Sequence, residues 1–401
     1  MKASEMDQAV QDRRAASDVN PGDANVGRRL VAEVLEPMKR AFVGKDEIID
    51  LMGVCLVAGE NLFLLGPPGT AKSALVHELG RRLSGRTFEY LLTRFTEPNE
   101  LFGPFDIRKL REGELLTNTE GMLPEASLVF LDELLNANSA ILNSLLGVLN
   151  ERVFRRGRET RPLPTLSVVG ASNRLPEEDT LAALFDRFLM RVPCDNVPGE
   201  HLGQVLDAGW RLDLGLHDRP ASIDVEDVRR LHKALPEVDL SEVRPAVVDL
   251  VARLRHAGIA ISDRRAVKLQ RLIAASALLS DRRKARLSDV WVFRYIWDTV
   301  ERQEVLASVV QQALEKTPPE PGDHPRARGE DAPDAEGLAR DLEQIADRVG
   351  NGQAPSQTDR AALADQLGLL AARCQWVTDE RQRTILLKQV EELWTKVGTK
   401  P

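Results

Sequence analysis

Short apolar runs alternate with amphipathic stretches in the middle of the chain. The apolar runs predict strands at 61–65, 88–93, 127–131, 166–171 and 188–192. The stretches between them have helical periodicity and predict helices at 72–84, 98–101, 138–149 and 179–186. Because strands and helices alternate, we expect an α/β core. Its parallel sheet should be covered by helices on both faces and should carry a site at the carboxyl ends of the strands.

Two segments interrupt this alternation. Residues 103–122 are predicted to form a hairpin inserted in the second helix, and residues 153–164 a hairpin before the fourth strand. The second hairpin is basic, with Arg155, Arg156, Arg158 and Arg161. These arginines are equally compatible with contact to an acidic polypeptide or nucleic acid, with a solvated turn, and with a contact between subunits.

The flanking segments have other patterns. Residues 1–27 are polar and are predicted to be a disordered arm, after which apolar stripes predict helices at 28–41 and up to residue 58. Beyond residue 200, helices are predicted at 224–235, 241–256, 263–280 and 287–302, as in an all-α lid. Prolines between 317 and 335 predict a flexible linker, and three helical stripes predict a small C-terminal helical module. The expected divisions are therefore 1–27, 28–200, 201–302, 303–335 and 336–401.

A glycine-rich turn joins the first strand of the core to its first helix. It reads Gly-Pro-Pro-Gly-Thr-Ala-Lys-Ser over residues 66–73, the layout of a phosphate-binding loop. Lys72 is placed to reach the β- and γ-phosphates of ATP, and the Ser73 hydroxyl to ligate Mg²⁺. Ala71 stands where glycine is usual; we expect it to open the helix with right-handed backbone geometry. The alternative is an ordinary turn between a strand and a helix, without a role in phosphate binding.

Polar residues also end the later strands. Asp132 and Glu133 follow the strand at 127–131; there Asp132 could hold the Mg²⁺ shell and Glu133 could polarise the attacking water, unless they only form a solvated turn. Asn173 follows the next strand and could orient that water or contact the γ-phosphate, although asparagine is also common in turns. Arg187 lies in a short amphipathic segment, where an arginine is usually solvated or paired with an acid.

Together these motifs resemble an AAA+ ATPase. Four segments are similar in sequence to the MoxR branch of this family, and within it to the RavA group. They are GPPGTAKS (66–73), GMLPEASLVFLDEL (121–134), ASNRLPEED (171–179) and ALFDRFLMRV (183–192). The resemblance covers residues 28–302 and implies the AAA+ core, a helical lid, ATP and Mg²⁺ as ligands, and ATP hydrolysis. It implies ATP-binding roles for Phe42, Val43 and Gly44 beside adenine and for Gly66, Pro67, Pro68, Gly69, Thr70, Ala71, Lys72, Ser73 and Ala74.

The resemblance also implies how subunits cooperate. Arg187 would point into the nucleotide site of a neighbouring subunit in a ring, most often a hexamer. Arg264 matches the second sensor, an arginine that contacts nucleotide from the lid, with Arg265 as the weaker candidate. MoxR relatives remodel proteins or help to mature them, together with a partner that carries a von Willebrand factor A domain. No match to the partner-binding module of RavA is visible in the tail, so its partner is not carried over.

Composition narrows the alternatives. A net charge of −8 gives no general affinity for nucleic acid, and only the basic hairpin would support a nucleic-acid motor. A nucleotide-gated scaffold that barely hydrolyses ATP is the other alternative, which loss of Glu133 or Arg187 would favour, and both are present. Three dispersed cysteines, no zinc-like spacing, no apolar run long enough to span a bilayer and no apolar signal core predict a cytoplasmic protein.

Overall fold

The computed structural model describes residues 21–113, 115–156, 159–176, 181, 184–214, 221–315, 318 and 320–328. Toward the C-terminus it describes 339, 342, 345–346, 367, 370–371, 374 and 380–397. The chain divides after Ala327 into two compact units, each considered by itself below.

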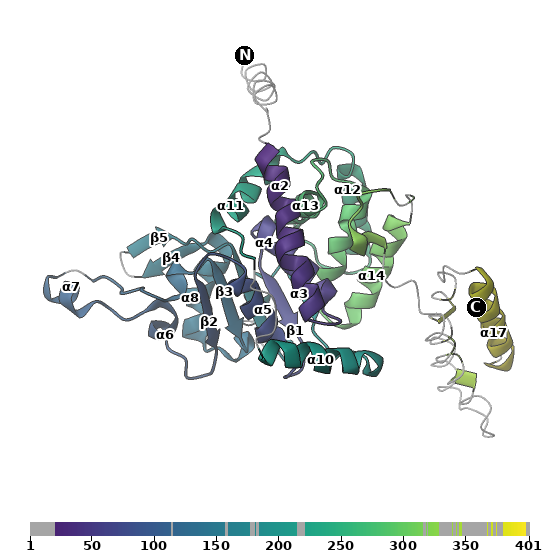
Figure 1. The fold of residues 1–401 in the computed structure, drawn as a ribbon, viewed down its shortest axis with the longest axis horizontal. Coiled ribbons are helices and arrows are strands. Elements are labelled where there is room, and N and C mark those ends of the chain that lie inside the picture. Colours follow the sequence, from purple (N-terminus) through teal and green to yellow (C-terminus); the bar gives the residue numbers. More distant parts are fainter. Residues whose placement is uncertain are drawn as a thin grey trace, which may run out of the picture. The chain divides into compact units, whose positions relative to one another are not determined.

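The first unit is built on a five-stranded sheet in the order β2-β3-β6-β1-β7, of which Figure 1 labels β1, β2 and β3. All its strands are parallel, and Leu62 in β1 lies opposite Val169 in β6 and Met190 in β7. This confirms the predicted parallel α/β core, because strands buried on both faces have continuous apolar runs. The strands are β1 (Leu62–Leu65), β2 (Thr87–Leu91), β3 (Leu128–Asp132), β6 (Ser167–Ser172) and β7 (Met190–Pro193).

Helices cover the sheet and lead into it. The core helices are α4 (Asp46–Ala58), α5 (Lys72–Arg81), α6 (Pro98–Phe102) and α8 (Ser139–Glu151). Helix α4 contacts β1 and β7 on one side and the lid helices on the other, and its residues from Ile48 to Ala58 are all buried. A helix buried on every side has no polar face, which explains the almost uninterrupted apolar sequence of α4.

The helical region begins earlier than predicted. Residues Pro21–Arg29 form α2, which continues through a π-helical turn, Leu30–Leu35, into α3 (Glu36–Ala41). The predicted disordered arm is therefore wrong for residues 21–27. Val26 is buried, and a Cβ atom on Gly27 would lie 2.7 Å from the carbonyl oxygen of Leu278. Close packing of α2 on α13 thus orders a segment whose composition looks polar.

The lid is helical, as predicted, except near its end. It contains α11 (Val225–Ala234), α12 (Arg244–His256), α13 (Asp263–Leu279) and α14 (Glu301–Leu314), and is preceded by α10 (Leu202–Asp213). The predicted helix at 287–302 is instead a 3₁₀ segment, Leu287–Tyr295, followed by a break and then α14. Residues Val290 to Phe293 are buried consecutively, so burial here has no α-helical period.

The two predicted hairpins have different structures. Strands β4 (Val153–Arg156) and β5 (Glu159–Pro162) pair antiparallel, as predicted for the basic hairpin, although Arg158 lies outside the described residues. In the first insertion, a single bridge joins Phe105 to Thr117, and helix α7 (Ile107–Arg111) lies beyond it. Figure 1 shows α7 projecting away from the sheet. This insertion is therefore a hairpin only at its base.

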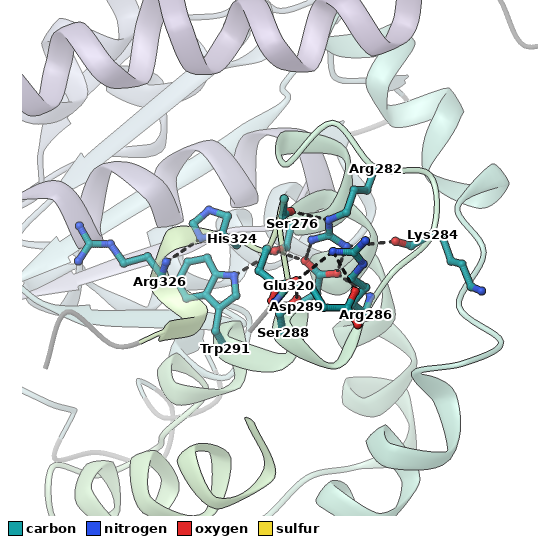
Figure 2. Close-up of polar contacts among 12 residues, drawn as sticks. Ser276, Arg282, Lys284, Arg286, Ser288, Asp289, Trp291, Glu320, His324 and Arg326 are labelled. Atoms are coloured by element: carbon teal, nitrogen blue, oxygen red, sulfur yellow. Dashed lines mark hydrogen bonds and ion pairs between the residues drawn. The ribbon is translucent and has the colours of Figure 1, made fainter. Parts of the chain in front are cut away.

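Residues 320–327 of the proline-rich segment pack within the first unit. His324 is buried and stacks on Trp291, with ring centroids 4.5 Å apart (Figure 2). The Asp323 carboxylate accepts a hydrogen bond from Ser288 at 2.9 Å, and Arg326 Nε donates to Asp50 of α4 at 2.9 Å. The predicted flexible linker is thus wrong for these residues, because side-chain contacts outweigh the local effect of the prolines. Burial also lowers the pKa of His324 to about 4, so its ring is neutral at neutral pH.

The second unit has its own small apolar core. Helix α17 (Glu380–Val397) contributes Leu386, Val390 and Leu393 to a cluster that also contains Leu342, Ile345, Leu367, Leu370 and Cys374. These residues come from the three predicted helical stripes. Within the described parts of both units, no helix combines the length and apolarity needed to cross a membrane.

Candidate functional site

The turn between β1 and α5 is folded tightly on itself. The ammonium group of Lys72 donates to the carbonyl oxygens of Gly66 and Pro67, both at 2.8 Å, and the Thr70 hydroxyl donates to Pro67 O at 2.9 Å. A Cβ atom on Gly66 would lie 2.1 Å from Cys194 O, so only glycine fits there. The tip of the turn, Pro67 to Gly69, stays exposed. The loop is thus a preformed cradle with a cation at its base, which suits a polyphosphate.

Ala71 does not have the backbone conformation that the sequence suggests. It is the N-cap of α5, with φ 69° and ψ 19°, in the left-handed region. The expectation of right-handed geometry is therefore wrong. For an L-residue with a Cβ atom, this conformation costs roughly 1–2 kcal/mol. Glycine is usual at this position because it avoids that cost.

We expect the Ala71→Gly variant to unfold at a higher denaturant concentration than the wild type. Relief of the left-handed strain is partly offset by the greater freedom of glycine in the unfolded chain, which leaves about 0.5–1 kcal/mol of added stability. Urea titration followed by circular dichroism measures this change. The control is Gly147→Ala in α8, where the backbone is right-handed and an added Cβ atom would lie 3.4 Å from Val153 O. It measures the effect of exchanging glycine and alanine in a helix without left-handed strain. An Ala71→Gly variant less stable than the wild type would contradict the strain.

A hydroxyl and a carboxylate meet beside this loop. Ser73 Oγ lies 3.3 Å from Asp132 Oδ2, and Asp132 Oδ1 accepts a hydrogen bond from the Glu133 amide at 2.9 Å. Adjacent oxygens around Mg²⁺ are about 3 Å apart when each lies 2.0–2.1 Å from the ion. The separation of the Ser73 and Asp132 oxygens is therefore compatible with two neighbouring positions of a magnesium shell, and their role as metal ligands stays a prediction.

Glu133 is held in an unusual conformation at the end of β3. Its φ of 49° places it in the left-handed region, where strain in a non-glycine residue often marks a functional site. Burial, and then the charge of Asp132, raise its pKa, whereas Lys72 and Arg174 act in the opposite direction. A carboxylate with a raised pKa is the better proton acceptor. Asn136 Nδ2 lies 3.4 Å from one of its oxygens.

Two further predicted groups lie on the same side. The Gly66 amide donates to Ser172 O at 3.1 Å, so the end of β6, and with it the exposed Asn173, lies against the phosphate loop. Gly44, in the turn of Phe42, Val43 and Gly44, packs near Val197, which follows β7 in the chain. The backbone amide of Cys194, directly after β7, donates to Leu65 O at the end of β1 at 2.7 Å. The adenine candidates are thereby brought to the loop side of the sheet.

Arg187 and Arg264 lie at the opposite end of the strands from the loop, where the strands begin. The carbonyl of Arg187 accepts a hydrogen bond from Asn61 Nδ2 at 3.0 Å, and Asn61 directly precedes β1. Arg264 is exposed on the first turn of α13, and Lys268 of that helix contacts Glu60 at 2.7 Å. Since all strands are parallel, the starts of the strands are remote from Lys72. The structure therefore groups Lys72, Ser73, Asp132, Glu133 and Asn173, and separates Arg187 and Arg264 from them.

Comparison with known proteins agrees with this geometry. Residues 28–233 match the family described as the MoxR domain in the MoxR-vWA-beta-propeller ternary systems, and residues 242–310 match an AAA lid domain. The chain belongs to the MoxR family of AAA+ ATPases. The MoxR match covers the sheet and the loop cradle, and the lid match covers α12, α13 and α14 as far as residue 310.

Individual proteins that resemble this MoxR chain share about a third of its residues or fewer over the aligned part. The uncharacterized protein MJ0812 of Methanocaldococcus jannaschii is 36% identical over 67% of this chain and 71% of its own length. Chaperone MoxR1 of Mycobacterium tuberculosis is 26% identical over 60% of this chain and 63% of its own length. A solved structure from Cytophaga hutchinsonii covers 74% of this chain and 96% of its own, with a TM-score of 0.60 at 20% identity, which shows the same fold.

Sequence reasoning missed two residues of this MoxR site. Asn136 contacts Glu133, and Arg174 donates to Asn136 Oδ1 at 3.4 Å. Asn136 lies three positions after Glu133, and Arg174 directly follows Asn173. Their proximity in sequence was thus a usable signal, but their contact depends on β3 and β6 being neighbours in the sheet.

Proposed function

We propose that this protein hydrolyses ATP and uses the energy to remodel or mature protein complexes, as a ring that works with a von Willebrand factor A domain partner. The observation that carries the proposal is the convergence of Lys72, Ser73, Asp132 and Glu133 beside one exposed loop. Cation, magnesium ligands and base are the parts that phosphoryl transfer to water requires.

Each residue has a distinct task in this proposal. Lys72 exchanges its loop carbonyls for the β- and γ-phosphate oxygens. Ser73 and Asp132 hold Mg²⁺, which when bound neutralises charge on the phosphates. Glu133 orients the attacking water and accepts its proton, and Asn173 holds the water or the γ-phosphate in line.

The proposed ring follows from the separation of Arg187 from the loop. Arg187 is about one-third exposed, and its Nε has no hydrogen-bond partner among the residues that the structure describes, so its guanidinium is incompletely used there. A head-to-tail contact between copies would place the strand starts of one subunit against the loop of the next. Repetition of such a contact closes a ring, for which six subunits is our expectation. On this geometry the exposed Arg264 would also reach the neighbour's nucleotide, whereas Arg265 is buried and donates to the carbonyl of Ile296.

The proposed partners rest on the family. The matched MoxR domain is described from ternary systems with vWA and beta-propeller proteins, which supports a von Willebrand factor A domain partner. The name chaperone MoxR1 supports a role in protein remodelling, with a protein as client. A closer relation to the RavA group and a cytoplasmic location stay predictions.

We expect ATP with Mg²⁺ to promote assembly of the ring. Nucleotide held between two subunits contacts both, so binding and assembly are thermodynamically linked. Light scattering of the full chain and of a chain ending at Arg328, with and without ATP and Mg²⁺, measures the mass. The shorter chain keeps residues 320–327, which pack within the first unit. A monomeric mass for both chains with bound ATP would contradict the ring and favour the nucleotide-gated scaffold.

A further inference from the structure

Arg191 is buried in β7 between the segment of Arg187 and the lid. Its side chain is 1% exposed. One end of its guanidinium donates to the carbonyl of Trp297, after the 3₁₀ segment of the lid, and Nη2 donates to the carbonyl of Phe185 at 3.1 Å. The guanidinium carbon also lies 4.1 Å from the centre of the Phe185 ring. One side chain therefore joins the lid to the turn that presents Arg187.

This arrangement is costly, which indicates more than packing. Burial lowers the pKa of Arg191 to about 9, and the nearby Arg265 acts in the same direction. Within the described part of the chain, the Nε of Arg191 has no hydrogen-bond partner. A methionine or leucine would fill the same space without the desolvation cost. What only arginine supplies is a rigid fork that can bond two carbonyl oxygens from separate parts of the chain.

The segment of Arg187 is fixed on its other side by the sheet. Asn61 holds the Arg187 carbonyl at 3.0 Å, and Phe63 of β1 packs edge-on against Phe185, with ring centroids 4.9 Å apart. Neither of these contacts involves a lid residue. The bond from Arg191 to Trp297, in contrast, joins β7 to the lid.

The lid contributes a second arginine to the same place. Arg265 of α13 donates to the carbonyl of Ile296 at 2.7 Å, next to Trp297. The carboxylate of Asp186 lies 3.8 Å from Arg187, 4.0 Å from Arg191 and 3.9 Å from Arg265. A shift of the lid that moves Arg265 or the Trp297 carbonyl therefore alters the surroundings of Asp186, and with them the position of Arg187.

We propose that Arg191 is a positioning residue that couples the lid to Arg187, so that the nucleotide state of one subunit sets how well its Arg187 serves the next subunit. The proposal rests on the proposed function, in which Arg187 acts on a neighbouring site. Lid movement between nucleotide states supplies the input, and the bonded chain from Trp297 through Arg191 to Phe185 transmits it.

Mixed rings of full-length chains test this coupling. The acceptor is Arg187→Ala, whose own site is intact but which offers no arginine. One donor is Glu133→Gln, expected to hold ATP without hydrolysing it, and the other is Lys72→Ala, expected to stay empty. Both donors offer Arg187, so hydrolysis reports only how well the donor's arginine serves the acceptor. Each donor is prepared with Arg191 and with Arg191→Met, and rates are expressed per mixed oligomer counted by native mass spectrometry.

With Arg191 present, we expect the ATP-holding and empty donors to differ in rescued turnover by roughly fivefold or more. With Arg191→Met, the two donors should rescue equally. The control Arg282→Met removes another arginine of the lid, whose pairing with Asp289 at 2.7 Å stays inside the lid, and should leave the donor difference intact. If Arg191→Met does not fold, Phe185→Leu removes the ring under Arg191 and should reduce the difference.

The outcomes separate the two proposals. If neither donor with native Arg191 restores any hydrolysis, the action of Arg187 on a neighbour fails, and the proposed function with it. If both donors restore it equally with native Arg191, or if Arg191→Met leaves their difference unchanged, Arg187 acts on its neighbour but the coupling through Arg191 is wrong.

Discussion

Arg187→Ala should bind ATP nearly as tightly as the wild type and hydrolyse it at least about 10³-fold more slowly. The arginine lies at the starts of the strands, whereas Lys72 and Glu133 lie at their ends, so its removal leaves the binding cradle untouched. An arginine that reaches a phosphate only in the transition state contributes to turnover rather than to binding. Steady-state hydrolysis and fluorescent-nucleotide titration measure the two effects. Arg230→Ala, which removes an exposed arginine paired with Asp227, is the matched control and should be neutral.

Mixing experiments distinguish action on a neighbour from action within one subunit. Lys72→Ala subunits have no working nucleotide site but keep Arg187. Arg187→Ala subunits keep the nucleotide site but lack the arginine. Rings that contain both can place an intact arginine beside an intact loop, so part of the activity should return. Absence of any recovery in oligomers shown to be mixed would contradict the assignment.

Lys72→Ala should abolish tight ATP binding, and Glu133→Gln should keep binding but lose turnover by about 10²–10⁴-fold. Lys72 is the cation at the base of the loop, while Glu133 directly follows β3 and bears a pKa that burial and the charge of Asp132 raise. Calorimetric titration with ATP and a phosphate-release assay measure the pair. Glu120→Gln, at an exposed position, is the control for loss of a carboxylate.

Lys72 also has a structural contact that needs its own control. Its ammonium group bonds the Gly66 and Pro67 carbonyls, so Lys72→Ala could act by loosening the loop. Thr70→Ala removes the other side-chain bond to Pro67 O without removing a charge. Equal loss of binding in both variants would assign the effect to loop geometry. Unchanged turnover in Glu133→Gln would remove that residue from its proposed task.

The same Glu133→Gln variant offers a way to find the client. A subunit that holds ATP without turnover should stay in its substrate-engaged state. Proteins that co-purify with tagged Glu133→Gln in ATP, and not with Lys72→Ala, are the candidates for client and partner. A von Willebrand factor A domain protein among them would support the partner proposed from the family.

The sequence predicted the sheet and the loop because both are encoded locally. Strands buried on two faces must be apolar throughout, and a phosphate loop needs its glycines, lysine and hydroxyl within a few positions. The same local reasoning failed at Ala71, whose left-handed backbone is imposed by the junction of β1 and α5. It also failed for residues 320–327, where Trp291 and Asp50 fix a segment that looks like a linker.

The remainder of the site depends on contacts between distant segments. Arg191 reads as an interruption of an apolar strand, and nothing near it in sequence shows that its fork reaches Trp297. Arg187 and Arg264 were recognisable as motif residues. Their position at the starts of the strands, away from Lys72, could be known only from the fold. Spacing along the chain thus identified which residues matter, whereas their grouping into two separate places came only from the structure.

Helix α4 also has a consequence for how the protein is made. Its apolar surface is buried partly against α13, which begins at Asp263, about 200 positions after α4 ends at Ala58. At translation rates of about 5–20 residues per second, roughly 10–40 s pass between synthesis of the helix and of that partner. During this time the apolar face of α4 is uncovered on the nascent chain. We therefore expect truncation before α13 to yield aggregated protein, and folding to depend on protection of α4 during synthesis.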